Sequence, residues 1–151
     1  MTHKRLMILF TALTVLVTLV IWGNSLRTVE QSDALNKKVS QAVRPTLDPN
    51  QKVEEEAFRT FLSKCVHVIE FTALGLCLGA AVYHGGCVKG RRYVCLPMLL
   101  ALSVGVADEF IQTFSGRGSA VADVLLDFGS AMLGFCLLSL ILLLSKKKTS
   151  V

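Results

Sequence analysis

The sequence predicts an all-α integral membrane protein, a four-transmembrane-helix bundle with a short extracytoplasmic amphipathic helix. Three observations lead to this fold class. Among its 151 residues 52% are hydrophobic and the mean hydropathy is +0.56. Four apolar runs approach or exceed the length needed to cross a bilayer, and basic residues flank them. Because a lipid-exposed segment satisfies its backbone polar groups as a helix, we expect four helices in a single domain, residues 1–151.

The expected spans cover about residues 6–22, 66–83, 94–113 and 121–144. The first span has 17 residues, close to the lower limit for a transmembrane helix. No convincing small-residue cleavage site follows it, which favours an uncleaved span over a signal peptide. In the second and fourth spans, Gly75 with Gly79 and Ser130 with Gly134 form pairs of small residues that are typical of close helix packing.

Residues 23–64 form the expected extracytoplasmic loop. The stretch RPTLDPNQK, residues 44–52, predicts a flexible turn. After it, apolar side chains recur at helical spacing, which predicts a short amphipathic helix lying on the outer surface and leading into the second span. These side chains are Ala57, Phe58, Phe61, Leu62 and Cys65.

Basic residues predict the orientation. They lie at residues 4–5 before the first span, at 89–92 between the second and third, and at 146–148 after the fourth. Because short cytoplasmic loops carry an excess of Lys and Arg, both termini are expected in the cytoplasm. The same distribution explains the net charge of +5 without a nucleic-acid partner, which we do not expect.

Polar side chains interrupt the apolar runs at one level of the bilayer. Their spacing of three or four residues gives each span a single polar face. Because a charge inside the bilayer costs about 2.5–3.5 kcal/mol, we expect these faces to converge on one outward-facing cavity, with Arg117 folding back to pair with the acids. Structural roles compete with this interpretation: Lys64 suits a snorkelling position and Asp123 suits a helix N-terminus. The polar set is Asn24, Lys64, His67, Glu70, Asp108, Glu109, Gln112, Arg117, Asp123 and Asp127.

Two segments, KCVHVIEFTALGLCLG (64–79) and DEFIQTFSGRGSAVADVLLDFGSAMLG (108–134), resemble the VanZ-like family of bacterial membrane proteins. The resemblance covers the second to fourth spans and implies a functional role for the polar residues from Lys64 to Asp127. It also implies a bacterial cytoplasmic membrane location and, through one family member, a link to resistance against teicoplanin, a glycopeptide with a lipid tail. The chain departs from the family pattern at Asp127, where asparagine is frequent, and near Ser115, where proline is common.

Three functions compete. The first is binding or modification of a membrane lipid or amphiphilic ligand, with Lys64, Gln112, Arg117 and Asn24 as ligand-binding candidates. The second is an intramembrane enzyme, metal-dependent or acid–base, acting on a lipid head group or cell-wall precursor. A divalent cation is a candidate cofactor, because carboxylates and histidine are common metal ligands. The third is a proton- or ion-coupled transporter, and the sequence leaves a homo-oligomer open. The catalytic candidates are His67, Glu70, Asp108, Glu109, Asp123 and Asp127.

Overall fold

Five helices make up most of the chain. The structure, a computed structural model, describes residues 1–91 and 93–148. The helices α1, α3, α4 and α5 are each long and apolar enough to cross a membrane. The predicted fold class is therefore confirmed, with α2 as the fifth helix. The bounds are α1 (His3–Ser25), α2 (Val29–Leu47), α3 (Glu55–Lys89), α4 (Cys95–Phe114) and α5 (Val121–Lys148).

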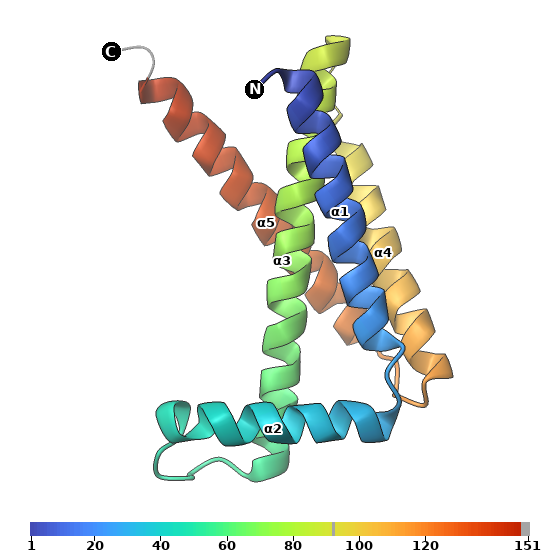
Figure 1. The fold of residues 1–151 in the computed structure, drawn as a ribbon, viewed down its shortest axis with the longest axis vertical. Helices are drawn as coiled ribbons and strands as arrows, with labels where there is room; N and C mark the ends of the chain where they lie inside the picture. The colour runs from blue at the N-terminus through green and yellow to red at the C-terminus, as the bar shows by residue number, and fades with distance from the viewer. Residues whose placement is uncertain (92, 149–151) are drawn as a thin grey trace.

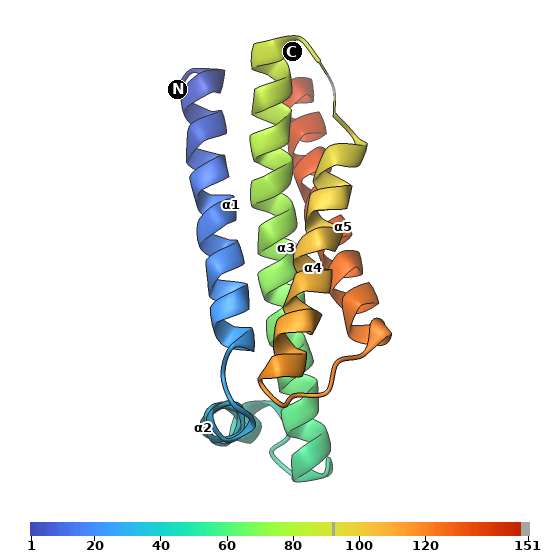
Figure 2. The ribbon, with the colours of Figure 1, turned by 90° about the vertical axis from the view of Figure 1, so that its right-hand side faces the viewer.

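Helix α3 lies at the centre of the bundle and contacts each of the other four helices. Helices α1 and α4 run in the opposite direction to α3, while α5 runs in the same direction and crosses α3 at an angle (Figure 1). The N-terminus and the C-terminal end of α5 therefore lie at one end of the bundle. Helix α2 and the loop between α4 and α5 lie at the other end (Figure 2).

The amphipathic helix is not where the sequence analysis placed it. Residues 55–65 do not form a separate surface helix but are the first turns of α3, which continues without interruption to Lys89. No proline or glycine separates the glutamates at its start from the apolar span, and negative charge in a first turn favours a helix. The helix that contains the second span thus begins at Glu55, eleven residues before the predicted start of the span.

Helix α2 is the amphipathic helix, and it lies across the end of the bundle, crossing the first part of α3 (Figure 1). Its start is a capping box, in which the Thr28 hydroxyl accepts from the Gln31 N–H and the Gln31 side chain accepts from the Thr28 N–H. The predicted flexible turn at 44–52 is wrong over its first part, because α2 continues through Pro45 to Leu47.

Asp48 closes the connection from α2 to α3. Its carboxylate accepts from the backbone N–H groups of Lys52 and Val53 at 2.9 and 3.1 Å. These two donors, together with the Arg44 guanidinium at 3.5 Å, hold the pKa of Asp48 below its ordinary value. The turn is therefore ordered by a carboxylate in its charged form.

Small residues bring α3 and α5 into backbone contact. A Cβ at Gly75 would collide with the carbonyl group of Ala131, and one at Gly134 would collide with the backbone of Thr72 and Leu76. Gly79 faces the side chains of Phe135 and Leu138 instead. The predicted packing role of these small residues is confirmed. Close approach at this crossing fixes how the polar turns of α3 and α5 meet.

Candidate functional site at the α2 end of the bundle

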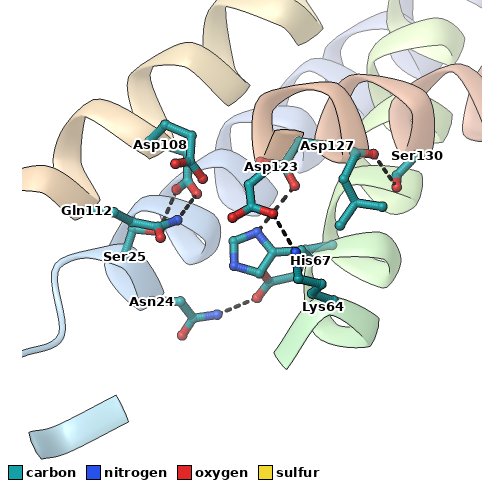
Figure 3. Close-up of polar contacts among 12 residues, drawn as sticks. Asn24, Ser25, Lys64, His67, Asp108, Gln112, Asp123, Asp127 and Ser130 are labelled. Atoms are coloured by element: carbon teal, nitrogen blue, oxygen red, sulfur yellow. Dashed lines mark hydrogen bonds and ion pairs between the residues drawn. The ribbon is translucent and has the colours of Figure 1, made fainter. Parts of the chain in front are cut away.

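Two polar pairs join α3 to α5 one turn apart. Lys64 Nζ lies 2.7 Å from Asp123 Oδ1, and His67 Nδ1 lies 3.2 Å from Asp127 Oδ1. Lys64 and His67 are three residues apart on α3, and Asp123 and Asp127 are four apart on α5, so the two polar faces meet in register. Figure 3 shows the two pairs, in which side chains of α3 and α5 point toward one another.

Burial increases along these pairs. The side chains of Lys64 and Asp123 are 52% and 32% exposed, whereas those of His67 and Asp127 are 17% and 0% exposed. The ring of His67 stacks on that of Phe71, with an interplanar angle of 7°. Packing against Phe71 limits the orientations that the imidazole can adopt.

A second polar group joins α1 to α4. The Ser25 hydroxyl donates to Asp108 Oδ1 at 2.6 Å, and the Gln112 amide donates to Asp108 Oδ2 at 2.8 Å (Figure 3). Asp108 and Gln112 lie one turn apart on α4, as predicted, and Asp108 is completely buried. Ser25 is a site residue that the sequence analysis did not select. Its position directly after Asn24 at the end of the first span was the available signal.

Glu70 and Glu109 face different neighbours. Glu70 accepts a hydrogen bond from the side-chain amide of Asn24, so this pair joins α3 to α1. Glu109 Oε2 accepts from the Ala120 N–H at 3.0 Å and thereby ties the start of α5 to α4. The other oxygen, Glu109 Oε1, is buried and has no hydrogen-bond partner among the residues that the structure describes.

A cleft of about 670 Å³ opens among α2, α3, α4, α5 and the loop before α5. The expectation of one cavity holding every polar group is wrong, because the walls of this cleft do not include Asn24, Glu70 or Asp108. Asn24 and Ser25 of α1 hydrogen-bond with Glu70 and Asp108 instead. The predicted residues that do line the cleft are Lys64, His67, Glu109, Gln112, Arg117, Asp123 and Asp127.

Arg117 lines the cleft without pairing with its acids. The loop turns at Gly116, whose φ of 75° favours glycine, and the Arg117 N–H then donates to the Gln112 carbonyl at 3.1 Å. Among the described residues, no hydrogen bond or ion pair involves the Arg117 guanidinium. The prediction that Arg117 neutralises the acids is therefore wrong, and Lys64 and His67 occupy that place.

Three side chains meet closely enough to share a metal ion. One ligand atom from each of His67, Asp108 and Asp127 lies within 4.8 Å of the others. Asp127 Oδ2 is buried and has no hydrogen-bond partner in the described part of the chain. The arrangement therefore offers two features, a polar cleft lined by the Arg117 side chain and, beside it, a group of ligand atoms from His67, Asp108 and Asp127.

Comparison with known protein families identifies the family of this chain. The family model described as VanZ/LLP1 matches residues 10–143. Neither the curated proteins nor the solved structures give a significant match.

Proposed function

The chain belongs to the VanZ/LLP1 family, and on this basis we propose that it binds the polar head group of a membrane lipid or another amphiphile in the cleft. In this proposal the α2 end faces the outside of a bacterial cytoplasmic membrane. The basic residues at 4–5, 89, 91 and 146–148 support that orientation, since they flank the ends of the spans away from α2.

The observation that carries the proposal is the half-buried Arg117 guanidinium in a cleft of about 670 Å³. Cavities of this size hold small ligands, and a guanidinium without a partner is suited to a phosphate or carboxylate. Arg59 and Lys64 also line the cleft, but each already pairs with an acid, Asp33 or Asp123. Among the described residues, Arg117 is thus the cleft-lining cation of these three that has no acidic partner.

The surroundings of the cleft fit an amphiphile better than a wholly polar ligand. Phe61, Val121 and Leu125 are 57%, 77% and 63% exposed and lie within about a turn of Lys64 and Asp123 on α3 and α5. An acyl chain could lie along these apolar side chains while its head group enters the cleft. Teicoplanin, which carries a lipid tail, is therefore a suitable probe, and vancomycin, which lacks that tail, is its control.

The test uses the purified full chain in detergent, titrated with teicoplanin and with vancomycin. We expect tighter binding of teicoplanin, and a loss of at least about tenfold in Arg117→Gln, because a charged hydrogen bond contributes about 1.5–3 kcal/mol. Lys38→Gln is the matched control, since Lys38 is an exposed cation of α2 that does not line the cleft.

Growth of a susceptible Gram-positive host measures the consequence in cells. Expression of the wild-type chain should protect against teicoplanin but not vancomycin, and Arg117→Gln at equal expression should remove that protection. Equal affinity of wild type and Arg117→Gln for teicoplanin would contradict the assignment of the cleft as the binding site. Equal affinity for teicoplanin and vancomycin would contradict the role of the lipid tail.

A further inference from the structure

Ligand atoms from three helices meet beside the cleft, whose walls include two of the three residues, His67 and Asp127. His67 comes from α3, Asp108 from α4 and Asp127 from α5, and one ligand atom of each lies within 4.8 Å of the others (Figure 3). Donor atoms bound to one ion at about 2.1 Å are separated by about 3.0–4.2 Å. The 3.2 Å between His67 Nδ1 and Asp127 Oδ1 already falls in that range, and small side-chain rotations would bring in Asp108.

One oxygen of the buried Asp127 carboxylate is not satisfied by hydrogen bonds from the described residues. Its side chain is completely buried, and Oδ2 has no hydrogen-bond partner among the described residues. A buried carboxylate oxygen without a donor is costly, so a bound ligand or a proton must satisfy it. Its neighbours at this point are the imidazole of His67 and the carboxylate of Asp108.

The surrounding side chains hold the three donors in place. Ser25 and Gln112 each donate to a different oxygen of Asp108, and both donors are buried. Every carboxylate oxygen has more than one lone pair, so these hydrogen bonds leave Asp108 able to bind a cation. Phe71 fixes the plane of the His67 ring. Hydrogen-bonded and packed ligands of this kind are typical of metal sites.

The charge balance also favours a cation. In the part of the chain that the structure describes, no Lys or Arg forms an ion pair with the interior carboxylates Glu70, Asp108, Glu109 or Asp127. Their one ion-pair partner is His67, through Asp127. Four interior carboxylates require protons or a bound cation to compensate their negative charge.

We propose that His67, Asp108 and Asp127 bind one divalent transition-metal ion, Zn²⁺ or Mn²⁺. The imidazole favours these ions over Mg²⁺ and Ca²⁺, which prefer oxygen ligands alone. Three protein ligands leave further coordination positions for water or for a ligand in the cleft, which His67 and Asp127 line. This inference does not depend on amphiphile binding, since the metal can be measured without any amphiphile.

The test measures metal bound to the full chain, purified in detergent and dialysed against equal concentrations of Zn²⁺, Mn²⁺ and Mg²⁺. We expect about one equivalent of bound Zn²⁺ or Mn²⁺ per chain in the wild type. In Asp127→Asn and in His67→Gln the amount of bound metal should fall at least tenfold. Glu70→Gln is the matched control, because it removes an intramembrane charge on α3 without removing a proposed ligand. It should keep its metal.

One further variant tests the hydrogen bonds that hold the metal ligands, and two assays identify variants that are unfolded. Ser25→Ala keeps all three donors but removes a hydrogen bond to Asp108, so it should weaken Zn²⁺ affinity by about 10-fold. Circular dichroism and size-exclusion chromatography identify any variant that fails to fold. The proposal is overturned if the wild type binds none of the ions. It is equally overturned if folded Asp127→Asn and His67→Gln bind as much metal as the wild type, or if Glu70→Gln loses as much as they do.

Discussion

Gly134→Ala tests the close crossing of α3 and α5 that aligns the polar pairs. A Cβ at residue 134 would lie 2.8 Å from the backbone nitrogen of Leu76 and closer still to the Thr72 carbonyl oxygen. Ordinary contact begins at 3.4 Å, so relief of the Leu76 contact alone requires about 0.6 Å of separation, and the Thr72 contact requires about 1.1 Å. Both obstructing groups are backbone atoms of α3, which a side-chain rotation cannot move.

Gly129→Ala is the matched control on the same helix. No atom lies within 4 Å of a Cβ built at Gly129, so this variant gains helix propensity without a steric cost. Both variants gain about the same 0.5–1 kcal/mol from replacing glycine in a helix. The difference between them therefore isolates the overpacking cost, for which about 3 kcal/mol, the upper end of the usual range, is expected at a rigid backbone contact.

The assay is reversible unfolding of the purified protein in mixed micelles, with the free energy of unfolding read from Trp22. This residue is the only tryptophan, and it packs against the core cluster of Ile21, Phe71 and Leu74. Gly79→Ala should fall between the other two variants, because the side chains of Phe135 and Leu138 can move away. If Gly134→Ala and Gly129→Ala unfold with the same free energy, the close contact does not exist in the membrane protein.

Two further predictions concern charges at the α2 end. Because the folded pKa of Asp48 is lowered, its stabilisation of the turn is full above the ordinary value of 3.8 and is lost as the pH falls through the folded pKa. Hydrogen-exchange protection of the Lys52 and Val53 amides should therefore decrease as the pH falls below 3.8. In Asp48→Asn this protection should be absent at every pH. A double-mutant cycle of Lys64→Gln and Asp123→Asn should give a coupling of about 0.2–1 kcal/mol, because both side chains are partly exposed. A coupling well above 1 kcal/mol would show that the pair is dehydrated.

The spans were predictable because each depends on local composition. Long apolar runs locate α1, α4 and α5 within a few residues, and helical spacing shows correctly that Lys64 and His67 share a face. The extent of α3 was not predicted, because its first turns carry charge that a hydropathy reading assigns to a loop. Helix α2 was missed although the capping box at Thr28 and Gln31 was readable.

Spacing could not predict which polar groups line the cleft and which, like Asn24, Glu70 and Asp108, lie outside its walls. Spacing fixes which residues share a face of one helix, but the rotation of that helix against its neighbours depends on packing. Glycine contacts at the α3–α5 crossing turn His67 toward α5, whereas Glu70, one turn further along, contacts α1. The Arg117 conformation is likewise set by the turn at Gly116 and not by the charges that it was expected to meet.

The more deeply a carboxylate of this site is buried, the less positive charge its partners offer it. In the first turn of α5 Asp123 has a lysine partner and contact with solvent, and one turn later Asp127 has a histidine as its one ion-pair partner among the described residues. Asp108 is completely buried and accepts hydrogen bonds from the uncharged side chains of Ser25 and Gln112. A structural role alone does not account for this order, because apolar residues in place of buried charges are often neutral or stabilising. A role in folding therefore explains the buried carboxylates of Asp108 and Asp127 least well, and a bound cation would compensate their charge.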